Sequence, residues 1–186
     1  MKRLFDLFGS TVLLVLLIFP IVIIIILIRF TSKGPAFYWS KRVGRDNVIF
    51  KMPKFRSMVV DTPTLASHLL EKPDSYLSPI GKFLRRSSLD ELPQLLSVLK
   101  GDMSFVGPRP ALYNQENLIT LRTEKGVDRL LPGITGWAQI NGRDELSIAH
   151  KVALDIEYLN RQSFWFDIKI LWMTFLKVMK RDGVSH

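Results

Sequence analysis

The chain has 186 residues, of which 26 are lysine or arginine and 17 are aspartate or glutamate, giving a formal charge of +9. This length is typical of one domain, and the lack of cysteine excludes a disulfide framework and thiolate-ligated zinc or iron–sulfur sites. The composition excludes a disordered, collagenous or coiled-coil protein, and the positive charge favours an anionic partner: nucleic acid, phospholipid headgroups or a phosphorylated small molecule.

Residues 12–28 form an uninterrupted apolar run, VLLVLLIFPIVIIIILI. As one straight helix this run would reach about 26 Å, slightly less than the roughly 30 Å of a bilayer's hydrocarbon core. The run is too long for a secretory signal peptide, and no small-residue cleavage site follows it. The segment is therefore predicted to enter a membrane.

Two features bear on how this segment meets the membrane. Pro20, near the centre of the run, removes a backbone hydrogen bond and clashes with the carbonyl one turn earlier, so a kink is expected. Lys2 and Arg3 precede the run and Arg29 and Lys33 follow it, so the positive-inside rule gives no orientation. Both features suit a re-entrant helix-break-helix hairpin, with a kinked spanning helix as an equal alternative on the residues alone. The rest of the chain then lies on one side, predicted to be the cytoplasm.

The remainder of the chain predicts an α+β protein that is mainly helical with one small β-hairpin. The β-prone segments 37–39 and 48–50 flank a turn at 44–47 and predict this hairpin. Residues 61–80 are predicted to be a loop with at most one helical turn. Four helices are expected, at about 80–100, 113–124, 145–161 and 164–180. We therefore divide the chain into a membrane segment, 1–32, and a globular domain, 33–186.

The last predicted helix is amphipathic. Its apolar side chains recur at helical spacing: Phe164, Ile168, Leu171, Trp172, Phe175 and Met179. This stripe predicts either packing on the domain core or a helix at the membrane headgroup boundary, anchored by Trp165 and Trp172. Both alternatives stay open, because they can hold for different faces of the helix.

The densest polar segment is Ser87-Ser88-Leu89-Asp90-Glu91-Leu92-Pro93-Gln94. Ser88 and Glu91 have the spacing of a capping box, which would give both a structural role. Pro93 argues against Ser88 as the N-cap, because the proline would then stand where a backbone donor is needed, whereas a cap at Asp90 loses no donor. In either case Asp90 and Glu91 lie at a helix N-terminus, whose free N–H groups suit anions.

Cationic residues surround this acidic pair in the sequence, with Lys82, Arg85 and Arg86 before it and Arg109 after it. Arg109 lies between two prolines, which restrict its backbone. The segment is either a stiff surface turn or a pre-positioned guanidinium that binds a phosphate. Carboxylates framed by phosphate-binding cations suggest phosphoryl transfer with a divalent metal, in which a carboxylate serves as nucleophile, metal ligand or both.

Three long stretches resemble the bacterial sugar transferase family: 78–94, 99–110 and 132–143. The segment Lys54-Phe55-Arg56-Ser57-Met58 and the proline-broken N-terminal run match as well, so the resemblance covers essentially the whole chain. It points to the monotopic phosphoglycosyl transferases, which load a sugar phosphate onto polyprenyl phosphate. The chain resembles their minimal catalytic form, without the extra N-terminal membrane helices of longer members.

The resemblance implies a monotopic protein on the cytoplasmic face of the bacterial inner membrane, with a re-entrant hairpin kinked at Pro20 and a catalytic domain over 33–186. It implies that Asp90, paired with Glu91, attacks the β-phosphate of a UDP-sugar, releases UMP and holds the sugar phosphate covalently. Polyprenyl (undecaprenyl) phosphate then accepts that group, in a ping-pong reaction that begins glycoconjugate assembly (glycoprotein, capsule or O-antigen). Mg²⁺ is the implied cofactor, held at Asp90 and Glu91.

Candidate phosphate ligands are the basic residues of the matching motifs: Arg85 and Arg109 first, then Arg86, Lys54 and Arg56. A second group either shapes a nucleotide-sugar pocket or belongs to a structural loop: Gly133, Thr135, Gln139 and Arg143. An N-acetylated amino sugar is the preferred donor sugar.

Two other functions are weighed against this one. A membrane-anchored module that binds nucleic acid or acidic lipid is not expected, because the basic residues are spread and their aromatic neighbours form no base-stacking array. A metal-dependent phosphatase with the same acids would release free sugar phosphate instead of transferring it. The oligomeric state, a homodimer included, stays open.

Overall fold

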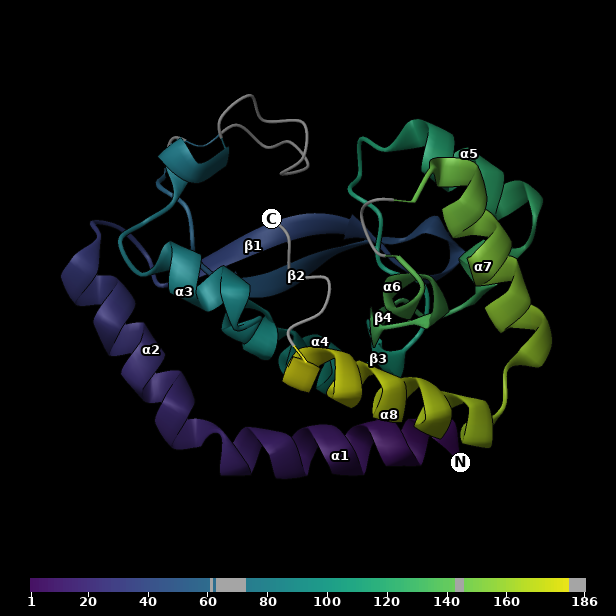
Figure 1. The fold of residues 1–186 in the computed structure, drawn as a ribbon, viewed down its shortest axis with the longest axis horizontal. Coiled ribbons are helices and arrows are strands. Elements are labelled where there is room, and N and C mark those ends of the chain that lie inside the picture. Colours follow the sequence, from purple (N-terminus) through teal and green to yellow (C-terminus); the bar gives the residue numbers. More distant parts are fainter. Residues whose placement is uncertain (61, 63–72, 143–145, 181–186) are drawn as a thin grey trace.

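The computed structural model describes residues 1–60, 62, 73–142 and 146–180. Two helices open the chain, α1 (Lys2–Leu16) and α2 (Ile18–Thr31), and they meet at a bend of 61° (Figure 1). No single described helix has the length and hydropathy to cross a membrane, whereas this bent pair together has both. The expected kink is present, but the break falls at Leu17. Pro20 thereby lies in the first turn of α2, where its missing N–H removes no intrahelical hydrogen bond.

The polar start of α1 packs against the domain. Asp6 is buried, with 2% of its surface exposed, and accepts hydrogen bonds from Ser104 Oγ and the Phe105 N–H, both at 3.1 Å. Arg3 donates to two carbonyls at the C-terminal end of α4 (Leu95–Lys100), at 2.6 and 2.8 Å. A cation is favourable there, because the last carbonyls of a helix have no intrahelical partner and carry the negative end of its dipole.

The predicted hairpin is confirmed. Strands β1 (Phe37–Val43) and β2 (Ile49–Phe55) pair antiparallel, with Phe37 opposite Phe55 and Val43 opposite Ile49. A second, parallel pair was not predicted: β3 (Ser104–Val106) and β4 (Gly133–Thr135). Each of these strands has three residues, which is too short for an alternating pattern to show in the sequence.

The predicted helix over 80–100 is wrong as a single element. The structure divides it into α3 (Gly81–Arg86), a 3₁₀ turn η4 (Leu89–Gln94) and α4. Ser88 separates the first two because its backbone is left-handed, with φ +54°, and within the described residues its side chain caps no N–H. Neither capping arrangement inferred from the sequence therefore forms, and Pro93 is accommodated inside η4.

The remaining described elements follow the predicted order with shifted bounds. Of the predicted loop 61–80, residues 61 and 63–72 lie outside the described part, and one short turn follows them. The later helices begin at or after the predicted positions, and the last matches its predicted bounds. These elements are η1 (Arg45–Asn47), η3 (Pro73–Tyr76), α5 (Glu116–Glu124), η5 (Val127–Arg129), α6 (Trp137–Ile140), α7 (Ile148–Arg161) and α8 (Phe164–Lys180).

The buried face of α8 matches the predicted stripe only in part. Phe166, Asp167 and Ile170 are buried at the main core and Leu171 of the stripe packs against it, whereas Trp172 and Met179 are exposed. Asp167 belongs to the buried face because it accepts hydrogen bonds there from Lys2 Nζ at 2.5 Å and from Tyr158 at 2.7 Å. Two charged or polar partners thus offset the cost of burying this carboxylate, a possibility that hydrophobic periodicity does not detect.

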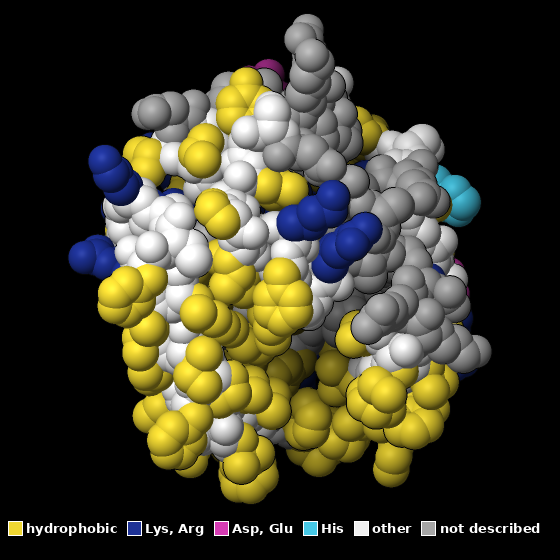
Figure 2. Space-filling view, turned by 60° about the vertical axis from the view of Figure 1, so that its left-hand side comes forward, with side chains coloured by type: hydrophobic (Ala, Val, Ile, Leu, Met, Phe, Trp, Pro, Cys, Tyr) yellow, Lys and Arg dark blue, Asp and Glu magenta, His cyan; other side chains and the backbone are white. Residues whose placement is uncertain are grey.

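Exposed apolar side chains gather on one side of the molecule. Figure 2 shows them along the lower side, where α1 and α2 lie in Figure 1. The most exposed large ones on the first two helices are Leu4, Phe8, Val15, Leu16, Phe19 and Phe30. Helix α8 adds Trp165, Trp172, Phe175, Val178 and Met179. Contiguous apolar surface of this kind marks a binding surface for a membrane or another protein.

Replacing Asp6 by alanine should destabilise the protein by about 1–3 kcal/mol, because two buried donors lose their acceptor. Thermal unfolding in detergent micelles would measure this as a lower Tm. Thr11→Ala is the matched control, since the exposed Thr11 hydroxyl bonds only within α1. Equal Tm values for wild type and Asp6→Ala would show that the hydrogen bonds of Asp6 to β3 contribute nothing to stability.

Candidate active site

Asp90 and Glu91 lie side by side in η4, which packs against β2. Asp90 is 8% exposed. Its burial raises the pKa of the carboxyl group to about 6, and the Glu91 charge acts in the same direction. Lys54, Arg85 and Arg109 oppose this rise without cancelling it. Asp90 is therefore a desolvated carboxyl group that is still largely ionised at neutral pH.

Glu91 joins two cations that come from distant parts of the chain. Its Oε1 accepts a hydrogen bond from Lys54 Nζ, on β2, at 2.8 Å, and one from Arg109 Nη2 at 3.4 Å. The side chains of Lys54 and Glu91 are both largely buried. The acidic pair is thus surrounded by positive charge in space as well as in sequence.

The loop that carries Arg109 is tied down along its backbone. Each carbonyl from Pro108 to Ala111 accepts a hydrogen bond, at 2.8–3.0 Å. The donors are, in order, the Gly133 N–H, Arg122 Nη1, Arg42 Nη1 and the Val43 N–H. Gly107 starts the loop where a Cβ atom would lie 2.2 Å from the Leu131 carbonyl oxygen, so only glycine fits without a shift. The loop therefore presents Arg109 from a fixed backbone.

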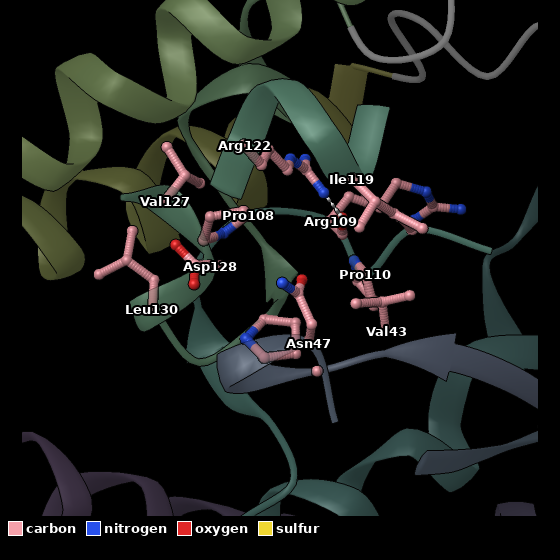
Figure 3. Close-up of a pocket in the computed structure, with 13 residues that line it drawn as sticks. Val43, Asn47, Pro108, Arg109, Pro110, Ile119, Arg122, Val127, Asp128 and Leu130 are labelled. Atoms are coloured by element: carbon pink, nitrogen blue, oxygen red, sulfur yellow. Dashed lines mark hydrogen bonds between the residues drawn. The ribbon is translucent and has the colours of Figure 1, made fainter. Parts of the chain in front are cut away.

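A pocket lies beside this loop (Figure 3). Its wall is mainly apolar, with Val43, Ile119, Val127 and Leu130 among the lining residues. The polar lining residues are Asn47, Asp128, Arg109 and Arg122. The pocket thus borders the Arg109 loop on the side of η1 and η5.

The other predicted phosphate ligands lie in different surroundings. Arg85, in the last turn of α3, is close enough to influence the Asp90 carboxyl group, and Arg86 next to it is exposed. Arg56 is buried and donates to the carbonyls of Lys33 and Ser32 at 2.7 and 3.0 Å. These contacts direct the Arg56 guanidinium to the end of α2.

The predicted nucleotide-sugar residues lie around β4. Gly133 and Thr135 bond to the Arg109 loop through their backbones, and Thr135 Oγ1 lies 2.7 Å from Thr174 Oγ1 on α8. Both polar atoms of the Gln139 side-chain amide are buried and have no hydrogen-bond partner among the described residues. Arg143 lies outside the described residues. A role for these residues in binding a nucleotide sugar stays a prediction.

Sequence reasoning missed the buried pair formed by Arg122 on α5 and Asp155 on α7. Arg122 donates to Asp155 Oδ2 through Nε and Nη2, at 2.9 and 2.7 Å. A signal was present: Val152, Asp155 and Tyr158 follow one another at three-residue spacing, so the acid lies on the buried face of an amphipathic helix.

The acidic pair fits a divalent cation in part. No cluster of three or more histidine, cysteine or acidic side chains able to hold a metal occurs among the described residues. Mg²⁺, however, is commonly bound through one or two carboxylates together with substrate phosphates and water. Asp90 and Glu91 supply those two carboxylates.

The model of the family described as "Bacterial sugar transferase" matches residues 1–181. The chain belongs to the bacterial sugar transferase family. This confirms the resemblance seen in the sequence and the prediction that the protein is a transferase.

Several bacterial sugar transferases are close relatives over the whole chain. The uncharacterized sugar transferase EpsL of Bacillus subtilis is 42% identical over 189 residues, which cover all of this chain and 91% of EpsL. The undecaprenyl-phosphate glucose phosphotransferase of Komagataeibacter xylinus is 42% identical. The match covers all of this chain and 36% of that protein. The UDP-glucose:undecaprenyl-phosphate glucose-1-phosphate transferase of Escherichia coli is 40% identical over 95% of this chain and 40% of its own. The 186-residue chain therefore corresponds to well under half the length of the Komagataeibacter and Escherichia transferases.

Replacing Asp90 by asparagine should stabilise the folded protein at neutral pH. The folded state holds the Asp90 proton more tightly than the unfolded chain, so between pH 4 and 6 unfolding releases a proton and stability falls as pH rises. Asparagine removes the cost of keeping an ionised carboxylate buried. The free energy of unfolding should therefore rise by about 1–3 kcal/mol at pH 7, and by less towards pH 4. Denaturant unfolding with a chelator present, with Asp102→Asn as control, measures it. A gain of the same size at both pH values would contradict the raised pKa.

Proposed function

We propose that the protein transfers a sugar 1-phosphate from a UDP-sugar to polyprenyl phosphate and releases UMP, by a ping-pong reaction through a covalent aspartyl intermediate. The observation that carries this proposal is the buried Asp90 carboxyl group, flanked by Glu91 and enclosed by Lys54, Arg85 and Arg109. The names of the relatives supply the donor and acceptor classes: UDP-glucose and undecaprenyl phosphate.

In the first step an oxygen of ionised Asp90 attacks the β-phosphorus of the UDP-sugar. A bond forms between this oxygen and the phosphorus, and the bond from the phosphorus to the bridging oxygen breaks. UMP leaves with that oxygen and its electron pair, and the sugar phosphate stays on Asp90 as an acyl phosphate. A carboxylate is a weak nucleophile in water, so its burial, together with cations that offset the charge of the diphosphate, favours the attack.

In the second step an oxygen of polyprenyl phosphate attacks the same phosphorus, and the Asp90 carboxylate leaves. The product is a polyprenyl diphosphate sugar, and Asp90 returns to its ionised form. Arg109 and Arg85 are assigned to the substrate phosphates, with Lys54 holding Glu91 in place. Two successive displacements at one phosphorus need no other nucleophile from the protein.

Mg²⁺ would be held by Asp90 and Glu91, and when bound it would neutralise charge on the donor's diphosphate. Glu91 keeps its orientation through Lys54 and Arg109, so the carboxylates are arranged before any ligand arrives. Preorganised charge of this kind costs no rearrangement during the reaction.

The membrane arrangement is part of the same proposal. We assign α1 and α2 to a re-entrant hairpin on the cytoplasmic face of the bacterial inner membrane, with the exposed apolar side of α8 at the headgroup boundary. The 61° bend, the exposed apolar surface and basic residues at both ends of the pair support this assignment. A polyprenyl acceptor is confined to the bilayer, so a monotopic domain brings its phosphate to a site at headgroup depth.

The chemistry is tested by incubating the protein with UDP-sugars without acceptor and measuring UMP. Wild type should release about one UMP per protein and keep the sugar phosphate bound; Asp90→Asn should release none, and Asp102→Asn should behave as wild type. UDP-glucose and UDP-galactose are the first donors to test, because named relatives act on glucose or galactose. Continuous release of free sugar phosphate without acceptor would instead indicate that the protein is a metal-dependent phosphatase that uses the same two acids.

The hairpin is tested by placing a single cysteine at either end of the α1–α2 pair, at Met1 or Lys33, in the naturally cysteine-free chain. Both should react with a membrane-impermeant thiol reagent from the cytoplasmic side of inverted vesicles and not from the outside of intact spheroplasts. Reaction of the two positions from opposite sides would mean a spanning pair.

A further inference from the structure

The ion pair between Arg122 on α5 and Asp155 on α7 is joined to the Arg109 loop by a hydrogen bond from Arg122. Two of the Arg122 nitrogens, Nε and Nη2, donate to Asp155. The third, Nη1, donates to the Arg109 carbonyl at 2.8 Å, as the dashed line in Figure 3 shows. The Asp155 side chain is 2% exposed and that of Arg122 is 11% exposed. The pair therefore holds the backbone of the residue whose side chain pairs with Glu91.

Stability alone does not account for this pair. Removing two charged groups from water costs several kcal/mol per ion, and well-packed apolar residues of similar volume are often as stabilising. Burial raises the pKa of Asp155, and Arg122 acts in the opposite direction. A guanidinium, however, can satisfy a carboxylate and a carbonyl at once from one rigid plane, which no apolar side chain can do.

A second arginine holds the next carbonyl of the loop. Arg42, on β1, donates to the Pro110 carbonyl, while Arg122, on α5, donates to the Arg109 carbonyl. The peptide units on either side of Pro110 are therefore each held by an arginine. Arg122 and Arg42 come from elements that do not carry the acidic pair. A small shift of a reacting or binding group costs a large factor in rate, so a fixed Arg109 backbone has a direct kinetic value.

We propose that Arg122, oriented by Asp155, is a positioning residue: it sets where Arg109 places its guanidinium beside Glu91 and the phosphates of the donor. This inference rests on the proposed function, because it assigns Arg109 to the substrate. Arg122 itself acts through the Arg109 backbone.

The test is a double-mutant cycle on UMP release in a single turnover. Arg122→Lys keeps the charge but cannot bond Asp155 and the Arg109 carbonyl with the same planar geometry, and should slow release about tenfold. In an Arg109→Ala background the same change should slow release less than about twofold, because the group that it positions is absent. Asp155→Asn should give the same pattern. Arg129→Lys, an exposed position on η5, is the matched control and should change nothing.

Hydrogen exchange gives a readout that does not depend on turnover. The backbone amides of Gly107, Arg109, Ala111 and Leu112 should exchange faster in Arg122→Lys and Asp155→Asn than in wild type and Arg129→Lys, when all are measured well below the Tm of the least stable variant. Additive losses in the Arg109→Ala background, or unchanged exchange in this loop, would overturn the positioning role. If wild type released no UMP from any UDP-sugar, the proposed function would fail, while the exchange measurement would still decide whether Arg122 orders the loop.

Discussion

The structure depends most on how it accommodates two adjacent, largely buried carboxyl groups, those of Asp90 and Glu91. Such a pair is stable only where cations and hydrogen-bond donors converge on it, because a desolvated charge without partners costs several kcal/mol. Lys54 and Arg109 provide them for Glu91, and they come from β2 and from the loop after β3. The hairpin, η4 and the parallel strand pair must therefore be assembled together before the site exists.

Asp90 is held less favourably than Glu91, and this difference separates their roles. Glu91 has two cationic partners within 3.4 Å, whereas burial dominates the environment of Asp90 and raises its pKa. Glu91 is thus held between two cations, whereas Asp90 is a desolvated carboxyl group with a raised pKa. A buried acid of this kind beside a second acid is a common feature of catalytic pairs.

The sequence predicted the features that depend on residue type and local pattern. The hairpin, the α8 bounds, the helix pair at the N-terminus and the acidic pair among cations could all be found there. What it missed depends on contacts across the fold. The left-handed backbone at Ser88 divides a helix that propensity would continue, and Asp6, Asp155 and Asp167 are buried because partners far along the chain satisfy them. In α8 the hydrophobic periodicity counts apolar side chains alone, so it left Asp167 off the buried face.

The contacts of Asp6 and Lys2 have a mechanical consequence. Asp6 bonds to Ser104 and Phe105, and Lys2 Nζ to the Val106 carbonyl, so successive residues of β3 are attached to the first turns of α1. The chain passes directly from β3 into the loop that carries Arg109. Because of these hydrogen bonds, a displacement of helix α1 along its axis would displace strand β3 with it. On the proposed membrane arrangement, the depth of α1 in the bilayer thereby sets the height of the Arg109 guanidinium above the lipid.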